Sequence, residues 1–137
     1  MNIAVHFSSE TVEWETPQVL FDKLNNVFNF QLDVCATADN RKAQSYFSKT
    51  DDGLAQQWTK CNWMNPPYGR EIYHWVKKAH ENPLTVCLLP ARTDTRWFHE
   101  FIYNNPKAEL RLIKGRLKFG GCANNAPFPS MIVIFRS

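Results

Sequence analysis

The sequence contains 137 residues, 44% of them hydrophobic and 21% charged, and its 16 Lys and Arg against 13 Asp and Glu give a net charge of +3. This length predicts a single domain over residues 1–137 with a core of its own. No run of 18 apolar residues occurs, and the first residues lack the basic flank and apolar stretch of a signal peptide, so we expect a cytoplasmic protein with no membrane partner.

The four cysteines, Cys35, Cys61, Cys87 and Cys122, lie far apart and form no C-x-x-C pair. The first three fall in apolar, strand-like runs, which is typical of buried thiols in a reducing compartment. Because no pair of Cys or His has the spacing of zinc ligands, we expect no metal site.

Charge is unevenly distributed along the chain. Residues 1–69 carry five Lys or Arg and eight Asp or Glu, whereas residues 70–137 carry eleven and five. The basic second half, in which Trp97 and Phe119 are interleaved with the charges, indicates a surface for nucleic acid. An ordinary solvated surface with a modest surplus of charge is the alternative.

The expected elements begin with a helix over residues 17–27, in which Thr16 is the N-cap and Pro17 the first helical residue. The polar segment 36–60 predicts one short helix near 39–45 and a helical turn at 54–58. A helix is expected at 71–81, with an apolar face formed by Ile72, Trp75, Val76 and Ala79, and another at 96–104. Strands are expected at 30–35, 61–64, 85–89, 110–113, 116–119 and 131–135, the last two forming an antiparallel hairpin. Alternating strands and helices predict an α/β fold with three layers, a mostly parallel sheet and sites at the carboxyl ends of the strands.

The most informative string is Asn65-Pro66-Pro67-Tyr68, directly after the strand expected at 61–64. Two prolines cannot donate to a sheet, so the chain must leave it there and form a loop suited to a site. The Asn65 side-chain oxygen and the Pro66 carbonyl could both accept hydrogen bonds from one exocyclic amino group, and Tyr68 offers a ring on which a base can stack. The string predicts methyl transfer to an amino group; a double-proline turn that only ends a strand is the alternative.

The chain resembles the S-adenosylmethionine-dependent DNA N-6-adenine methyltransferases, and most closely the short, phage-type Dam-like family. The resemblance covers nearly the whole chain, from about residue 13 to residue 135, and its combination of motifs is far more specific than any one of them. The motifs are Glu15-Thr16-Pro17, Leu32-Asp33-Val34-Cys35-Ala36-Thr37, Asp52-Gly53-Leu54, Asn65-Pro66-Pro67-Tyr68-Gly69, Leu89-Pro90-Ala91-Arg92-Thr93-Asp94-Thr95, Gly115-Arg116-Leu117-Lys118-Phe119-Gly120-Gly121 and Ala126-Pro127-Phe128-Pro129-Ser130.

This resemblance implies a reduced Rossmann-like methyltransferase domain, encoded by a phage or prophage, that methylates adenine N6 in DNA. It implies direct methyl transfer to a flipped base, with Asn65, Pro66, Pro67 and Tyr68 at the acceptor and S-adenosylhomocysteine as the product. An RNA or protein-glutamine acceptor, and an inactive DNA-binding module, are the alternative functions.

The resemblance also implies a cofactor site. Thr16 would bind the cofactor carboxylate, a role that only the resemblance favours over an ordinary N-cap. Asp33 would face the ammonium group, with a solvated loop residue as the alternative, and either Asp51 or Asp52 would contact the adenosine unless the two only form a turn. The remaining residues implied on the cofactor side are Pro17, Cys35, Leu54 and Asn65.

Two departures from the family pattern concern the cofactor and the DNA. The stretch 35–40 contains no glycine where a glycine-rich loop usually holds the cofactor, and only 31 residues separate Asp33 from Asn65, so part of the usual sheet is expected to be missing. No separate DNA-reading domain fits in the chain, so loops 91–97 and 119–129 would contact DNA, or a homodimer would complete the surface. The DNA contacts we expect are Arg70, Arg92, Arg96, Lys118 and Phe128, with surface charge as the alternative for Arg92 and Arg96. Phe119 and Phe128 would form a wall of the pocket for the flipped base, with core packing as the alternative for Phe119.

Overall fold

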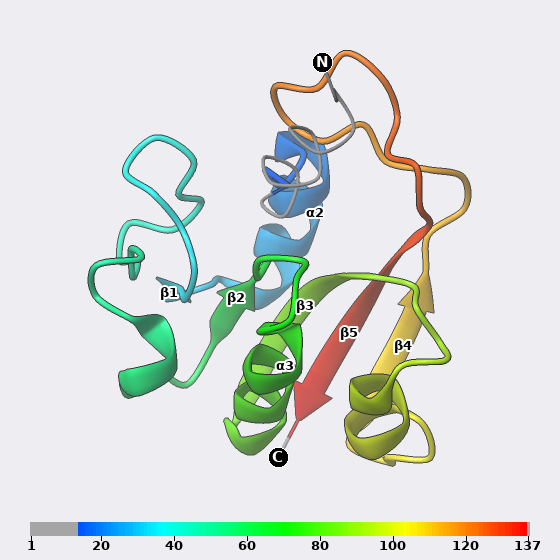
Figure 1. Ribbon diagram of the computed structural model, residues 1–137. Helices are drawn as coiled ribbons and strands as arrows, with labels where there is room; N and C mark the ends of the chain where they lie inside the picture. The colour runs from blue at the N-terminus through cyan, green and yellow to red at the C-terminus, as the bar shows by residue number, and fades with distance from the viewer. Residues whose placement is uncertain (1–13, 137) are drawn as a thin grey trace.

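A computed structural model describes residues 14–136 and shows a mixed α/β fold built on one sheet (Figure 1). Within this range, no helix has the length and apolar character needed to cross a membrane. In chain order the elements are α2 (Gln18–Phe28), β1 (Leu32–Asp33), the 3-10 turn η1 (Gly53–Ala55), β2 (Asn62–Met64), α3 (Ile72–Glu81), β3 (Leu84–Pro90), the π-helical turn η2 (Phe98–Ile102), β4 (Ala108–Leu112) and β5 (Ser130–Arg136).

The sheet has five strands in the order β1-β2-β3-β5-β4. β1, β2 and β3 are parallel, whereas β5 runs antiparallel to both β3 and β4. The predicted α/β class is therefore confirmed: the sheet is parallel over β1, β2 and β3 and antiparallel where β5 pairs with β3 and β4, and these two antiparallel pairings are longer than the parallel ones. The parallel part is short because only 31 residues of chain are available between Asp33 and Asn65.

The core lies around β3 and β5, whose side chains are nearly all buried because both strands are continuous apolar runs. In Figure 1, α3 lies in front of the sheet and α2 recedes behind β2. α2 packs on the sheet through Phe21, whose ring meets Trp63 of β2 edge to face at 5.4 Å. α3 buries Ile72, Trp75, Val76 and Ala79, the stripe that its helical spacing predicted.

Two predictions about the elements were wrong. Residues 116–119 form no strand, because both edges of β5 already pair with β3 and β4, so β4 is the strand before β5 in the antiparallel hairpin. The short helix expected near 39–45 is absent from the described residues. Two other elements are present but shorter than predicted: the first strand covers Leu32–Asp33 rather than 30–35, and the helix expected at 96–104 covers 96–102, with its last part π-helical.

In place of the helix expected near 39–45, the segment is held by hydrogen bonds with side chains and with β1. The N–H of Lys42 donates to Oδ2 of Asp33 at 3.0 Å, and the N–H of Thr37 donates to Oδ1 of Asn40 at 2.7 Å. Next in the chain, the Ser45 carbonyl and the Phe47 N–H both bond to the backbone of Asp33, at 3.0 Å each. Residues 45–47 therefore lie beside β1.

Candidate active site

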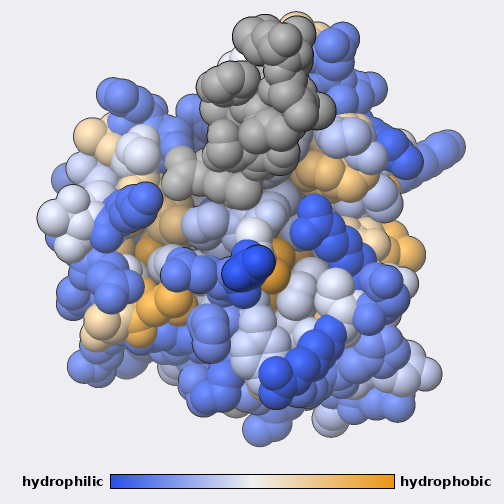
Figure 2. Space-filling model, viewed as in Figure 1, coloured by the Kyte–Doolittle hydropathy of each residue, from blue (hydrophilic) through white to orange (hydrophobic). Residues whose placement is uncertain are grey.

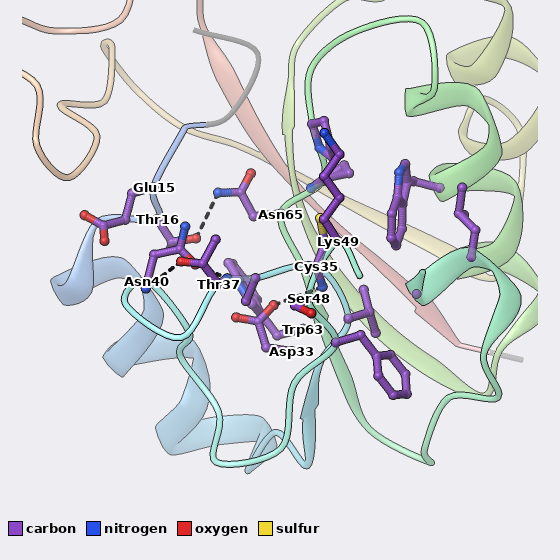
Figure 3. Close-up of a pocket in the computed structure, with 18 of the residues that line it drawn as sticks. Glu15, Thr16, Asp33, Cys35, Thr37, Asn40, Ser48, Lys49, Trp63 and Asn65 are labelled. Carbon is purple, nitrogen blue, oxygen red and sulfur yellow. Dashed lines mark hydrogen bonds between the residues drawn. The ribbon is translucent and has the colours of Figure 1, made fainter. Parts of the chain in front are cut away.

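A pocket of about 420 Å³ opens at the carboxyl ends of β1 and β2, with the residue after β2, Asn65, in its wall (Figure 3). It brings together segments that lie far apart in the sequence, because parallel strands end at the same edge of a sheet. The sequence-predicted site residues that line it are Thr16, Asp33, Cys35, Asp52, Leu54, Asn65, Pro66 and Pro67. Those that do not line it are Pro17, Asp51, Tyr68, Arg70, Arg92, Arg96, Lys118 and Phe128.

The side chain of Asn65 is held in one orientation. Its Nδ2 donates to the backbone carbonyl of Trp14 and to Oγ1 of Thr16, the latter at 3.0 Å. Because a backbone carbonyl can only accept, the amide nitrogen must face Trp14 and the oxygen must face the other way. This oxygen, Oδ1, is buried and has no hydrogen-bond partner. An unpaired buried acceptor costs about 1–3 kcal/mol, so the site is prepared for a donor from a ligand.

Thr16 does not cap α2, contrary to the sequence prediction. Pro17 occupies the N-cap position, and no side chain bonds the first turn of the helix. The Thr16 side chain is instead buried and accepts the hydrogen bond from Asn65 (Figure 3). A hydroxyl that accepts one hydrogen bond still has its own hydrogen to donate, so Thr16 can serve Asn65 and a ligand together.

Asp33 is a buried carboxyl in the wall of the pocket. Burial raises the pKa of this carboxyl from 3.8 to about 7, although hydrogen bonds from the N–H groups of Lys42 and Cys35 and the charge of Lys42 act in the opposite direction. The side chain is 2% exposed, and the two hydrogen bonds measure 3.0 and 3.3 Å. Such a carboxyl is ready to accept a cationic group, whose charge would favour its ionised form.

The turn at residues 48–56 separates the two candidate aspartates. Asp51 accepts hydrogen bonds from the N–H and hydroxyl of Ser48, at 2.8 and 2.9 Å, and these bonds lower its pKa. Asp52 lines the pocket in a left-handed conformation, with a φ of 55°. Asp51 therefore shapes the turn, and Asp52 is the carboxylate that a ligand in the pocket would meet.

The same turn is tied to the core by glycine and by two long side chains. A Cβ atom on Gly53 would lie 2.3 Å from the Val34 carbonyl, so only glycine allows this close approach. Trp58 Nε1 donates to the Gly53 carbonyl at 2.8 Å. Nζ of Lys78, on α3, donates to the carbonyls of Leu54 and Gln56. Helix α3 thus fixes the position of the turn that carries Asp52.

The glycine-free stretch after β1 still borders the pocket. Thr37 and Asn40 close a tight turn by exchanging hydrogen bonds, Thr37 N–H to Asn40 Oδ1 at 2.7 Å and Asn40 N–H to Thr37 Oγ1 at 3.2 Å. Both residues line the pocket (Figure 3). Side-chain hydrogen bonds therefore hold this loop where the resemblance predicts a glycine-rich one.

Tyr68 lies in an aromatic cluster beside the pocket rather than in its lining. The ring is 5% exposed and meets Phe128 and Phe119 edge to face at 5.7 and 6.4 Å. The hydroxyl donates to the Leu88 carbonyl at 3.0 Å. Trp14 completes the cluster through contacts with Phe119 and Phe128. Phe119 is 1% exposed, so the core-packing alternative describes this residue.

The basic residues expected to meet DNA differ in their surroundings. Arg96 is already paired within the chain, because its Nε lies 2.5 Å from Glu100 Oε1 and its guanidinium lies 4.5 Å from the ring centre of Tyr73. The Arg92 guanidinium lies 5.9 Å from the ring centre of Phe128, at the edge of the aromatic cluster. Arg70 and Lys118 are exposed, and Figure 2 shows a largely hydrophilic surface on the face drawn.

Three tryptophans belong to this site although no sequence motif selected them. Trp14 supplies the carbonyl that orients Asn65. Trp63 and Trp75 both line the pocket, and the Nε1 atom of each is buried without a hydrogen-bond partner. Helical spacing marked Trp75 only as part of an apolar stripe, because a period cannot tell a core ring from a ring that also borders a cavity.

The chain is similar to known methyltransferases. The family described as DNA N-6-adenine-methyltransferase (Dam) matches residues 6–137. The DNA N-6-adenine-methyltransferase of Escherichia phage T1 is 34% identical over a region that covers 64% of this chain and 39% of the phage protein. A protein of Escherichia coli (strain K12), provisionally named methyltransferase YfdM, is 33% identical over 41% of this chain and 70% of its own length.

This chain therefore spans about two fifths of the phage T1 enzyme, or 39% of its length. The family match, in contrast, runs from residue 6 to the last residue and includes the strand end, the Asn65-Pro66-Pro67-Tyr68 string and the pocket wall. The chain belongs to the DNA N-6-adenine-methyltransferase (Dam) family.

Proposed function

We propose that this chain transfers the methyl group of S-adenosylmethionine to N6 of adenine in DNA. The observation that carries the proposal is the buried, unpartnered Oδ1 of Asn65, fixed in place by Trp14 and Thr16. An exocyclic amino group that donates to Oδ1 would satisfy this atom. With the Pro66 carbonyl as a second acceptor, both hydrogens of the amino group are held and its lone pair is directed at the methyl donor.

The pocket residues fit the cofactor. The buried Asp33 carboxyl suits the ammonium group, the Thr16 hydroxyl suits the carboxylate, and Asp52 suits the adenosine half. When bound, S-adenosylmethionine supplies a methyl group on a sulfonium, which an amine can attack without a covalent enzyme intermediate. The pocket volume of about 420 Å³ lies in the range of small-molecule sites.

The acceptor base requires a rearrangement of the aromatic cluster. Tyr68 is 5% exposed, so a base can stack on it only if Phe128 moves aside. Phe128 is the suitable residue to move, because it is half-buried and lies between two prolines in a loop, whereas Phe119 is fully buried. Stacking of a base is worth about 1–3 kcal/mol, which offsets part of the cost of base flipping.

The test is incubation of the purified chain with methyl-labelled cofactor and DNA, followed by nucleoside analysis. Wild type is expected to form N6-methyladenine, and Asn65→Ala is expected to lower the rate by about a hundredfold or more, because the aligned acceptor is lost. RNA and a glutamine peptide serve as competing acceptors. The proposal fails if wild type forms no N6-methyladenine, or if label goes to another acceptor. Calorimetry with S-adenosylmethionine alone tests the alternative of an inactive DNA-binding module, because such a module would not bind the cofactor.

A further inference from the structure

The two edges of the sheet differ in whether another segment covers them. At one edge, β1 is only two residues long and segment 45–47 bonds to it through the Asp33 N–H and carbonyl, both at 3.0 Å. At the other edge, β4 has five residues and pairs on one side only, with β5. Within residues 14–136, no further strand covers its outer side. A strand with unpaired backbone groups is a template for another strand.

The outward-facing backbone groups of β4 can be identified from its bonds to β5. The Ile113 N–H donates to the Ser130 carbonyl, and the Lys107 carbonyl accepts from Arg136, so odd-numbered residues face β5. Because the direction alternates along an antiparallel strand, the N–H and carbonyl of Leu110 point outward. Leu110 and Leu112 are also 41% and 70% exposed. Figure 2 shows hydrophobic surface at the side of the molecule where Figure 1 places β4.

The side chains of β4 are complementary to a second β4 that runs in the opposite direction. When Leu110 lies opposite Leu110 of the other copy, Glu109 faces Arg111 and Ala108 faces Leu112 in both directions. Opposite charges across a strand pair attract and like charges repel. A parallel arrangement would instead bring Glu109 toward Glu109 and Arg111 toward Arg111. The charge pattern therefore selects one partner orientation, which is also the closed two-fold arrangement.

Glu109 and Arg111 already lie close together on β4, where the second copy would pair. Glu109 accepts from Arg111 Nε at 2.5 Å and from Arg136 Nη1 at 2.7 Å, and these bonds lower the pKa of Glu109. The three side chains are about half exposed, so a second copy can share the network without burying an unpaired charge. The exposed Leu110 and Leu112 would gain apolar contacts at the same time.

We propose that β4 is the dimer interface of this protein, and that its occupant is a second copy of the chain paired antiparallel about Leu110. The two five-stranded sheets then form one continuous sheet. The pocket lies at the β1 and β2 side of the sheet, away from β4, so both pockets stay open in the dimer. The proposal does not depend on the methyltransferase activity.

The test is analytical ultracentrifugation of the purified full chain, without DNA or cofactor, over a concentration series. Wild type is expected to reach twice the chain mass of 16.0 kDa. Arg111→Glu places Glu opposite Glu, and Glu109→Arg places Arg opposite Arg, so each variant alone is expected to dimerise roughly tenfold more weakly. An equimolar mixture of the two variants restores opposite charges in both pairs and is expected to recover the dimer.

Val27→Lys is the matched control, because Val27 is an equally exposed apolar residue on α2, at 71%. This variant is expected to dimerise like wild type, and circular dichroism checks that every variant is folded. A wild-type chain that stays monomeric over the whole series would overturn the proposal. So would a dimer that both charge variants leave intact, or a mixture that fails to recover the dimer when each variant is folded.

Discussion

Asn65 is the residue on which the candidate site depends, and its orientation is set by residues 14 and 16. The sequence predicted that the Asn65 side-chain oxygen accepts a hydrogen bond from an amino group. It did not reveal which residues hold the Asn65 side chain in place. Asn65 follows Met64 and precedes two prolines, and none of these offers a strong side-chain hydrogen-bonding group, so the restraint has to come from a distant segment. Trp14 and Thr16 provide this restraint only because the chain before α2 lies against the end of β2.

Replacing Thr16 tests this coupling. In Thr16→Val the hydroxyl is lost with little change of shape, so Asn65 keeps only its bond to Trp14. We expect kcat to fall about five- to tenfold, in line with a lost hydrogen bond of about 1–1.5 kcal/mol. Thr16→Ser keeps the hydroxyl and should stay close to wild type. Equal rates for the valine and serine variants would show that Thr16 has no role in orienting Asn65.

The raised pKa of Asp33 predicts that the free energy of unfolding depends on pH. The pKa of this carboxyl in the folded chain, about 7, is above its ordinary value of 3.8, so the folded state binds the proton more tightly than the unfolded state. Between these values the free energy of unfolding therefore falls as pH rises, and above pH 7 this contribution no longer changes. In Asp33→Asn the free energy of unfolding should lose this slope. Urea titrations of both proteins from pH 4 to pH 8 measure the difference, and identical slopes would contradict the assignment.

The Asp33 carboxyl should also make cofactor affinity depend on pH, but this affinity should rise with pH whereas the free energy of unfolding falls. An ammonium group binds the ionised form, so we expect the affinity for S-adenosylmethionine to rise as pH rises toward 7, by up to about tenfold per pH unit, and then to level off. Asp33→Asn should bind weakly at every pH. Isothermal titration calorimetry at several pH values measures this, and a wild-type affinity that is flat below pH 7 would exclude an ionised Asp33 as the ammonium partner.

Among the elements, the turn at 48–56 shows how a helix can position a loop. Sequence patterns predicted α3 and a turn before β2, but no pattern in one segment reveals that Lys78 of α3 donates to the carbonyls of Leu54 and Gln56. The same limit explains the wrong strand at 116–119. Its residues alternate as a strand would, but a strand also needs a free edge, and β3 and β4 occupy both edges of β5.

Lys78→Met should loosen this turn while keeping the apolar stem of the side chain. Because Asp52 is carried by the turn, we expect cofactor affinity to fall severalfold, with a smaller change in kcat. Lys77→Met is the matched control, since Lys77 is exposed and makes only a 3.8 Å ion pair with Glu81. Calorimetry of both variants decides the matter: similar affinities would mean that Lys78 does not position the site.

At the scale of the whole molecule, the basic second half of the chain is not one uniform surface. Arg96 is bound to Glu100 and covers Tyr73, whereas the guanidinium of Arg92 lies beside Phe128. The charge difference between the two halves of the sequence therefore overstates how many cations are available for DNA. Only the folded chain distinguishes an arginine that is paired internally from one that can meet a phosphate.

The different surroundings of Arg92 and Arg96 predict that replacing them has unequal effects on DNA binding. Arg92→Ala should weaken binding to duplex DNA and reduce the salt slope by about one, since one phosphate contact is lost. Arg96→Ala should change both quantities much less, because the wild-type side chain is already paired. Fluorescence anisotropy at several salt concentrations measures the slopes. A larger effect at Arg96 than at Arg92 would show that its ion pair opens on DNA.

The sequence alone was enough to predict the α/β class and elements at 61–64, 71–81 and 85–89, which the structure places at 62–64, 72–81 and 84–90. It also predicted a candidate site for an amino group where the chain leaves a strand at two prolines. These features depend on local patterns of apolar residues and proline, which are readable in one segment. Only the tertiary structure decided that Thr16 bonds Asn65 rather than capping α2, that Asp52 rather than Asp51 lines the pocket, and that β4 is the open edge of the sheet. Each of these depends on contacts between segments far apart in the chain, and such contacts are fixed by strand order and packing rather than by any local pattern.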